Sequence, residues 1–145
     1  MYQHILIATD GSELAGKAVT TGLALAKQLS AAVTAVTVTE PWTALIAGEM
    51  ALGFPYQEYE QGAAENAARI LAAVREAGKG IGVAWATGPL PDRFPAEAIV
   101  EYANEQGCDL IVMASHGRRG LSKLLLGSET TGVLTHSSVA VLVCR

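Results

Sequence analysis

The sequence has no long apolar run and few basic residues, and each shortage argues against a class of protein. No uninterrupted apolar stretch reaches the roughly 18 residues that a membrane-spanning helix needs, so we expect no membrane partner. Of the 145 residues, 10 are Lys or Arg and 14 are Asp or Glu, which gives a formal charge of −4. Nucleic-acid binding needs a basic face that neutralises phosphates, so we expect no nucleic-acid partner either.

The chain also has few charged residues and no visible targeting signal. Only 17% of it is charged and 50% is hydrophobic, which argues against a disordered tail or linker, because such segments cannot bury enough apolar surface to fold. Residues 1–4 lack the basic start of a signal peptide, so a cytoplasmic location is expected. A length of 145 residues supports one hydrophobic core but not two, so residues 1–145 are expected to form a single domain.

Two kinds of apolar pattern alternate along the chain. Short runs rich in apolar and β-branched residues predict strands at residues 5–9, 33–39, 81–87, 109–114 and 139–144. Apolar residues at spacings of three and four predict helices at residues 14–29, 64–78, 95–107 and 129–136. This alternation predicts an α/β fold with a five-stranded parallel sheet. Right-handed crossovers place helices on both faces, giving a three-layer sandwich.

The two cysteines, Cys108 and Cys144, are too few for a disulfide framework, and neither has a second ligand at the C-x-x-C spacing of zinc sites. Cys108 precedes the fourth expected strand and Cys144 ends the fifth, so in parallel strands they lie at opposite ends, roughly 20 Å apart. A disulfide needs Cα atoms within about 7 Å. We therefore expect two free thiols that pack as small hydrophobic groups.

The long segment at residues 40–56 interrupts this regular alternation. It contains Pro41, Gly48, Gly53 and Pro55, which are too many helix-breaking residues for a confident helix. Irregular stretches of this length in compact domains are often lids or contact surfaces. A surface loop with one short helical turn is the alternative.

Two segments of the sequence are expected to meet where a ligand would bind. In a doubly wound sheet, ligands bind beyond the carboxyl ends of the strands, and residues 10–12 and 114–128 follow the first and fourth strands. Gly117 and Gly120 permit close approach of backbone N–H groups to an anion. Gly127 and Ser128 precede a helix whose N-terminus favours negative charge.

Arg118, Arg119 and Lys123 add positive charge to the second of these segments. An ordinary glycine-rich loop with solvated basic residues is the alternative. Residues 11–17 match the phosphate-binding pattern G-x-x-x-x-G-K, but Ala18 follows where that motif needs a hydroxyl for Mg²⁺. The helical pattern also begins by Leu14, which leaves too little loop to wrap a phosphate. The dinucleotide pattern G-x-G-x-x-G is absent.

Residues 5–12, 108–117, 124–128 and 139–143 resemble the single-domain universal stress proteins. The ATP-binding members of that family carry a Gly, two residues, a Gly, nine residues, and then Gly followed by Ser or Thr. Gly117, nine intervening residues and the pair Gly127-Ser128 fit this pattern, whereas Ala114 replaces the first Gly. Ala114 continues the fourth strand, where φ is negative and Ala fits without strain, so we expect nucleotide binding to survive this replacement.

The resemblance implies a Rossmann-like sheet of the adenine nucleotide alpha hydrolase-like kind, with strand order 3-2-1-4-5 and ATP, ADP or AMP at its carboxyl edge. Asp10 matches the acid that lies near the phosphates and their Mg²⁺ or Mn²⁺ ion. Val38 matches the residue whose backbone holds adenine. The full set of expected contacts is Thr9, Asp10, Val38, Met113, Ala114, Ser115, His116, Gly117, Arg118, Gly120, Gly127, Ser128 and Glu129, with Asp10 also as the metal ligand.

Some of these polar residues have a structural alternative. Asp10 would cap the first helix, a role for which Ser12 is also suited. Ser128 would cap the last helix while also donating to a phosphate. In the implied strand order, the apolar residues 139–143 lie at the sheet edge, which invites pairing with a second polypeptide. A two-fold dimer through the last strand is therefore expected.

The function expected from these features is that of an ATP-binding stress-response sensor or regulator, with a regulatory protein partner that the sequence does not identify. A stress protein that acts only through protein contacts is one alternative. An ATP-consuming transferase or pyrophosphatase is another, but such enzymes of this fold carry an SGGxDS-type loop, which residues 9–13 do not match. No catalytic residue is assigned. Slow ATP hydrolysis stays open, because a bound metal and N–H groups stabilise developing charge.

Overall fold

The computed structural model describes residues 1–45, 56–117 and 125–145. Its core is a five-stranded sheet in which the strand order is β3-β2-β1-β4-β5 and all neighbours are parallel, so the expected order is confirmed. The strands are β1 (His4–Ala8), β2 (Ala32–Val38), β3 (Trp85–Leu90), β4 (Leu110–Ala114) and β5 (Ala140–Cys144). The helices are α1 (Glu13–Leu29), α2 (Trp42–Leu45), α3 (Tyr56–Ala77), α4 (Pro95–Glu105) and α5 (Ser128–His136).

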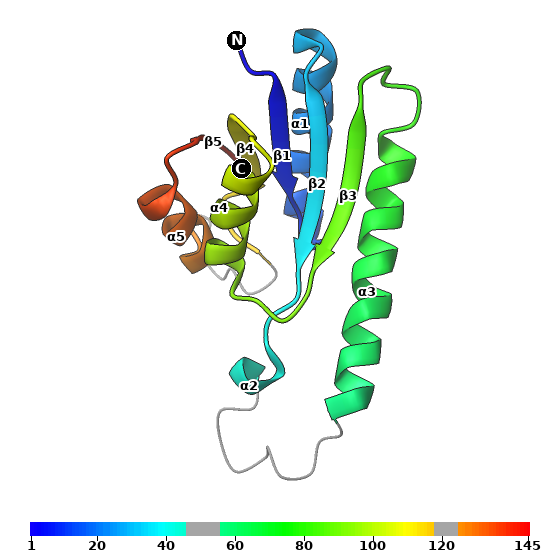
Figure 1. The fold of residues 1–145 in the computed structure, drawn as a ribbon, viewed down its shortest axis with the longest axis vertical. Helices are drawn as coiled ribbons and strands as arrows, with labels where there is room; N and C mark the ends of the chain where they lie inside the picture. The colour runs from blue at the N-terminus through cyan, green and yellow to red at the C-terminus, as the bar shows by residue number, and fades with distance from the viewer. Residues whose placement is uncertain (46–55, 118–124) are drawn as a thin grey trace.

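Helices cover both faces of the sheet and form the three expected layers (Figure 1). On one face, α1 packs against β1 and β4 while α3 packs against β2 and β3. On the other face, α4 and α5 pack against each other and against the sheet. Alternate residues of β1 supply the two halves of the core: Ile5 and Ile7 face α1, whereas Leu6 and Ala8 face α4.

The central strand β1 joins segments from both halves of the chain. It pairs with β2 on one side and with β4 on the other. The N–H of His4 donates to Oδ1 of Asp109 at 3.1 Å, and Nε2 of the same histidine lies 2.8 Å from Oγ1 of Thr34. The segments that follow β1, β2 and β4 therefore lie along one edge of the sheet, although β4 is far from the other two strands in the sequence.

The third strand lies further along the chain than expected, at Trp85–Leu90 instead of residues 81–87. Gly80 and Gly82 have φ values of +73° and +77° and form a turn where the strand was expected to begin. The strand continues through Pro89 because the carbonyls of Ala84 and Leu90 accept hydrogen bonds from the N–H groups of Val33 in β2 and of Thr39 just after it. Alternation then directs the nitrogen of Pro89 to the free edge of the sheet, where no N–H is needed. The other four strands differ from expectation by one residue, at both ends of β1 and β2 and at the first residue of β4 and β5.

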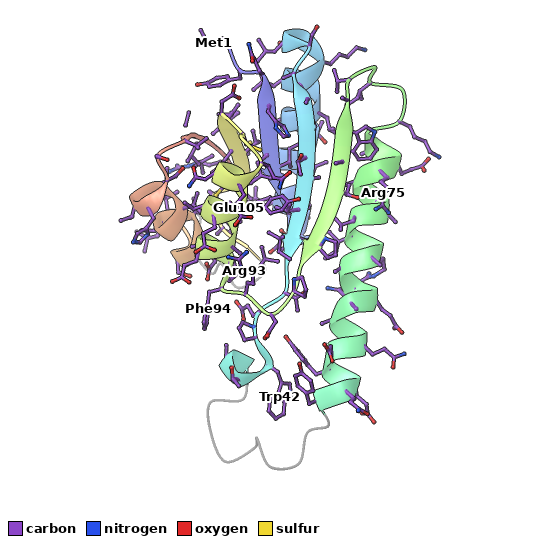
Figure 2. All side chains as sticks on the ribbon, in the orientation of Figure 1. Met1, Trp42, Arg75, Arg93, Phe94 and Glu105 are labelled. Atoms are coloured by element: carbon purple, nitrogen blue, oxygen red, sulfur yellow. The ribbon has the colours of Figure 1, made fainter. Side chains whose placement is uncertain are left out.

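The helix α3 begins at Tyr56, eight residues before the expected start. Its buried residues lie between Ala67 and Val74, so its first turns carry no apolar stripe and pass beyond the ends of the strands (Figure 1). Tyr59 donates from its hydroxyl to the carbonyl of Glu40 at 2.8 Å. The ring of Trp42 meets that of Tyr56 edge to face at 5.8 Å, and Figure 2 shows Trp42 beside the start of α3.

In the segment 40–56, the structure therefore contains one short helix, Trp42–Leu45, and residues 46–55 lie outside the described ranges. Both cysteines are free, and they lie at opposite ends of neighbouring strands, because Cys144 pairs with Ala114 while Cys108 precedes Leu110. None of the helices in the described ranges combines the length and the hydropathy that spanning a bilayer requires.

Candidate functional site

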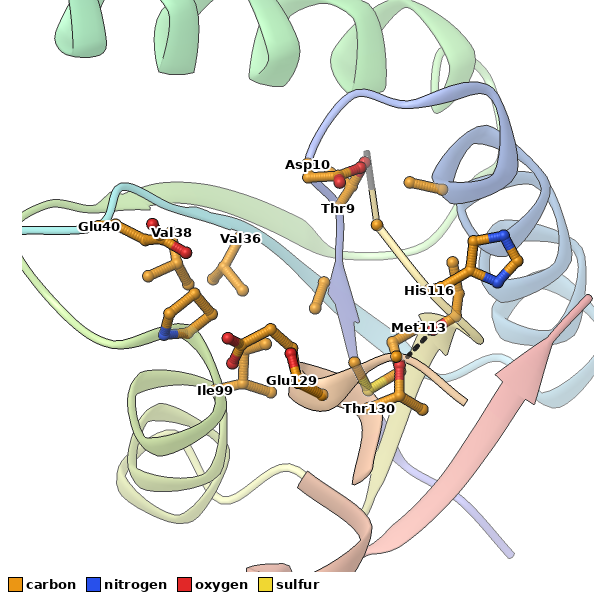
Figure 3. Close-up of a pocket in the computed structure, with 17 residues that line it drawn as sticks. Thr9, Asp10, Val36, Val38, Glu40, Ile99, Met113, His116, Glu129 and Thr130 are labelled. Carbon is orange, nitrogen blue, oxygen red and sulfur yellow. Dashed lines mark hydrogen bonds between the residues drawn. The ribbon is translucent and has the colours of Figure 1, made fainter. Parts of the chain in front are cut away.

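A cavity of about 360 Å³ opens at the carboxyl ends of β1, β2 and β4, on the face covered by α4 and α5 (Figure 3). This volume falls within the range of roughly 300–1,000 Å³ that is usual for small-molecule sites. Ten of the thirteen expected contact residues line it: Thr9, Asp10, Val38, Met113, Ala114, His116, Gly117, Gly127, Ser128 and Glu129. Arg118 and Gly120 lie outside the described residues. The binding roles of all thirteen stay predictions.

Ser115 is buried beside the cavity and does not line it. Its N–H donates to the carbonyl of Cys144 at 2.8 Å, and its own carbonyl accepts from the N–H of Gly127 at 2.7 Å. Its hydroxyl lies 3.1 Å from Nδ1 of His116. The backbone of Ser115 thus connects the end of β4 to the start of α5.

The turn after β1 holds Asp10 at the edge of the cavity. Gly11 has a φ of +76°, a conformation that favours glycine. Oδ1 of Asp10 accepts from the N–H of Ser12 at 2.9 Å. Ser12, not Asp10, caps α1, because its hydroxyl accepts from the N–H of Ala15 at 3.2 Å. The Asp10 carboxylate therefore has its orientation fixed by the turn and is not used to cap the helix.

Gly117 is a glycine because the Asp10 carboxylate lies against it. A Cβ at position 117 would be 2.7 Å from Oδ2 of Asp10, which is closer than a carbon and an oxygen can approach without displacement. The close approach joins the turn after β1 to the segment after β4. These two segments are more than a hundred residues apart in the sequence, and both were expected to meet here.

Gly127 is required for a similar reason at the start of α5. A Cβ there would lie 3.0 Å from Cα and 3.1 Å from Cβ of His116. Gly127 has a φ of −64°, so space and not handedness excludes a side chain. Gly127 is the N-cap and Ser128 is the first helical residue, which corrects the expectation that Ser128 caps this helix. The first N–H groups of a helix have no acceptor within it, and those of α5 begin at the cavity.

Ala114 keeps ordinary strand backbone, as expected. It belongs to β4, and the non-glycine residues with positive φ in the described ranges are Ser30 and Asp92. Its carbonyl accepts from the buried hydroxyl of Thr130 at 2.9 Å. This hydrogen bond and the one from Gly127 to Ser115 fix the first turn of α5 against the end of β4.

Val38 lies at the other end of the cavity, where β2 extends past β1. The N–H of Thr9 donates to Val36, and the N–H of Thr39 donates to Leu90 of β3. Since successive residues of a strand direct their backbone groups to opposite sides, the N–H and C=O of Val38 face the side of β1. That strand ends at Ala8, so these backbone groups face the cavity.

Seven further lining residues were not expected from the sequence: Ala8, Ala15, Val36, Glu40, Pro95, Ile99 and Thr130. Pro95 and Ile99 are the lining residues that α4 contributes, and Figure 3 shows Ile99 among the side chains around the cavity. In the sequence they appeared only as a helix start and a core position. Glu40 follows Val38 by two residues, and the two-residue alternation of a strand was the available signal for it. Burial, together with the Glu40 and Asp92 carboxylates, raises the pKa of Tyr59, which favours the protonated phenol that donates to the backbone carbonyl of Glu40.

A divalent ion fits this site only if a ligand brings further oxygen atoms. Within the described part of the protein, no three His, Cys, Asp or Glu side chains converge as a metal site. Asp10 offers one carboxylate in a position that its turn fixes. Mg²⁺ commonly takes one or two protein carboxylates and completes its coordination with phosphate oxygens and water, so the residues present fit an ion that arrives with a phosphate.

The fold and this cavity define a doubly wound α/β protein with a ligand site at the carboxyl edge of its sheet. The model of the Universal stress protein family matches residues 1–145. The chain belongs to the universal stress protein family.

Individual relatives agree with this assignment. Universal stress protein MJ0531 of Methanocaldococcus jannaschii is 32% identical over 147 residues, covering 100% of this chain and 83% of the relative. The solved structure of MJ0577 from the same organism superposes with a TM-score of 0.83 at 28% identity, covering 99% of this chain and 96% of that one. A universal stress protein solved in complex with cAMP gives a TM-score of 0.73 at 25% identity, covering 99% of this chain and 97% of that one.

Proposed function

We propose that this protein binds an adenine nucleotide, ATP, ADP or AMP, in the cavity and acts as a nucleotide-dependent sensor or regulator of a stress response in the cytoplasm. The observation that carries the proposal is the pairing of two features across one cavity. At one end lie the backbone groups of Val38 and at the other the N-terminus of α5. The complex of a relative with cAMP, itself an adenine nucleotide, supports the same class of ligand.

The proposed orientation places the base near Val38 and the phosphates near Asp10. Adenine presents a hydrogen-bond donor beside an acceptor, which backbone carbonyl and N–H groups match. Apolar side chains of Val36, Ile99 and Met113 line the cavity and suit the faces of a base. Phosphates would accept hydrogen bonds from the first N–H groups of α5. Arg118 and Gly120 remain part of this proposal because of the positive charge of Arg118 and the close backbone approach that Gly120 permits.

The negative charge of the cavity lining is the reason why the proposal includes a divalent metal ion. The acidic residues along the described lining are Asp10, Glu40 and Glu129, and a polyphosphate adds more negative charge. A Mg²⁺ or Mn²⁺ ion held by Asp10 and phosphate oxygens would supply the compensating positive charge. We therefore expect ATP to bind much more weakly when EDTA removes divalent ions.

We also propose that the protein is a homodimer through β5 and has a further regulatory protein partner. Among the strands of the described residues, β5 pairs with β4 alone, and Val141, Leu142 and Val143 are half-buried in the single protomer. An unpaired apolar edge strand is a template for pairing with a second protomer. Light scattering at micromolar concentration should give twice the protomer mass of 15.1 kDa, whereas a strictly monomeric mass would refute the dimer.

Calorimetry with ATP and Mg²⁺ tests the proposed nucleotide site, using two exposed positions of α5 as a matched pair. Ser128 lines the cavity, whereas Thr131 does not. Ser128→Trp should fill the mouth of the cavity and abolish binding, and Thr131→Trp should bind like the parent. If the parent binds no adenine nucleotide, and none is released from freshly purified protein on denaturation, this is a stress protein that acts only through protein contacts.

A further inference from the structure

We infer that Glu129 is a positioning residue: its carboxylate braces the start of α4 against α5 and thereby sets the separation of two walls of the cavity. Glu129 directly follows the Gly127-Ser128 pair of the family motif and is among the expected nucleotide contacts, but its geometry assigns it to the protein itself. The effect on affinity rests on the proposed nucleotide function. The brace is also a property of the ligand-free protein and is measurable there.

The first observation is a hydrogen bond between two helices. Oε2 of Glu129, in the first turn of α5, accepts from the N–H of Ala96 at 3.0 Å. The two residues are 33 positions apart. Figure 3 shows the Glu129 side chain on the side of Ile99, a residue of α4, and away from Asp10.

The second observation is that α4 has no cap of its own. Its N-cap residue is Phe94, whose side chain makes no hydrogen bond to the helix and which is 56% exposed (Figure 2). Pro95 has no N–H, so Ala96 carries the first N–H of the helix. Glu129 therefore supplies from another helix the acceptor that a Ser, Thr or Asp normally supplies locally. Its negative charge also suits a helix N-terminus.

The third observation is the close contact of the helices at the same residue. A Cβ on Gly132 would lie 2.8 Å from Cβ of Ala96. Gly132 follows Glu129 by one helical turn, so the hydrogen bond and the close contact both converge on Ala96. Without a side chain at position 132, α5 can approach α4 closely enough for the Glu129 carboxylate to reach its target.

The brace matters to the cavity because the two helices form different parts of its lining. Pro95 and Ile99 come from α4, and Ser128 and Thr130 come from α5. Thr130 fixes α5 to β4 through the carbonyl of Ala114. The hydrogen bond from Ala96 to Glu129 then holds α4 against α5. The lining residues of α4 and those of α5 therefore keep a constant separation.

Three variants test the brace: Glu129→Ala, Glu129→Gln, and the control Glu97→Ala. Glu97 is an exposed carboxylate in the first turn of α4, and it does not line the cavity. Amide hydrogen exchange at Ala96 is measured without ligand, and dissociation constants are measured for Mg·ATP, AMP and adenosine. Removing the acceptor of an N-cap hydrogen bond makes local opening at the start of a helix about tenfold more frequent. Glu129→Ala should therefore speed exchange at Ala96 about tenfold, and it should weaken all three ligands by a similar factor.

Glu129→Gln keeps an oxygen that accepts from Ala96 and should restore exchange and affinity to near the parental values. Glu97→Ala removes a charge from the first turn of α4 but no hydrogen bond to Ala96, so it should speed exchange there much less than Glu129→Ala and leave affinity unchanged. Unchanged exchange at Ala96 in Glu129→Ala would overturn the inference. It would also be overturned if Glu129→Gln were as defective as Glu129→Ala and the defect appeared for ATP but not adenosine, because Glu129 would then contact the phosphates or their metal. If the parent binds none of the ligands while exchange responds as expected, the proposed function fails and the brace stands.

Discussion

The same strands form both faces of the sheet, but the helices that cover the two faces make different contacts at the carboxyl edge. Beneath α1 and α3, Ile5 and Ile7 belong to one packed cluster, and the hollow there, beside Gly11 and Arg69, is the smaller at about 270 Å³. Beneath α4 and α5, Leu6 and Ala8 are packed in the same way, but the cluster ends at the larger cavity. The helices α4 and α5 pack apolar residues against the sheet as α1 does, and hydrogen bonds at the first turns of α4 and α5 also join them to each other and to β4. The larger cavity thus lies where polar contacts at the helix starts are added to the apolar packing.

The largest expected effects come from truncating the core on each face. Leu6 and Ile7 are adjacent in β1, point to opposite faces and are both fully buried. Leu6→Ala and Ile7→Ala should each lower the free energy of unfolding by about 2–5 kcal/mol, as measured by urea denaturation. If the free energy of unfolding of one variant falls by less than about 1 kcal/mol, the residues around that position are not a tightly packed core. The two faces would then differ in their packing.

The second largest expected effect is a difference in alkylation rate between the thiols of Cys108 and Cys144. Burial, aided by the charge of Asp109, raises the pKa of Cys108 from 9.0 to about 11, whereas Cys144 is half-buried on the other face. A rise of two units leaves about 100-fold less thiolate at pH 8. Iodoacetamide should therefore modify native Cys144 first, and the variant Cys144→Ser should react very slowly.

The same shift gives the sign of a pH dependence. Because folding raises the pKa of Cys108, the neutral thiol is the favoured form in the native state. Its contribution to stability is complete below about pH 9 and is lost as the pH rises through about 11. Rapid alkylation of Cys108 in native Cys144→Ser at pH 8 would show that this thiol is not desolvated.

Two helical glycines provide a matched pair with smaller effects on stability. A Cβ on Gly22 would lie 2.6 Å from Cδ1 of Ile7, and one on Gly132 would lie 2.8 Å from Cβ of Ala96. Overpacking costs about 1–3 kcal/mol, and Ala recovers up to about 1 kcal/mol in a helix, so each Gly→Ala variant should lose about 1 kcal/mol on balance. Calorimetry should show weaker nucleotide binding for Gly132→Ala alone. Equal losses of affinity in both variants would mean that the two faces respond alike.

The smallest expected effect concerns Ala114, where the sequence departs from the family motif. Ala114→Gly removes one methyl group from the cavity wall without relieving any strain, because Ala114 already has strand backbone. The affinity for ATP should change by less than about tenfold, or 1.4 kcal/mol. A parent that binds nothing beside a glycine variant that binds well would show that this methyl group blocks the site.

The fold was predictable because local patterns carried most of it. Apolar runs located β1, β2, β4 and β5 to within one residue, since a strand buried on both faces has few polar interruptions. The pattern failed at β3, where Gly88 and Pro89 are poor strand residues that an edge position tolerates. It also failed at the start of α3, whose first turns contact α2 and not the core.

The site was predictable in its motif but not in its walls. The sequence predicted that Asp10, Gly117 and Gly127 lie together, because the ends of parallel strands converge. It did not show why positions 117 and 127 must be glycine, because a side chain there would collide with Asp10 and His116, respectively. Ile99 gave the same apolar signal as any core residue. The acceptor that Glu129 provides for α4 depends on how two helices cross, which no local pattern contains.

The position of β1 between β2 and β4 also has a consequence for the order of folding. The contact of His4 with Thr34 spans 30 residues, whereas its contact with Asp109 spans 105, and the longer closure costs about 1 kcal/mol more entropy. During synthesis at roughly 5–20 residues per second, the nascent polypeptide therefore spends seconds with one edge of β1 uncovered, and such an edge is prone to aggregation. Until β4 adds to that edge, Asp10 has no Gly117 to meet, so the cavity is among the last features of the molecule to form.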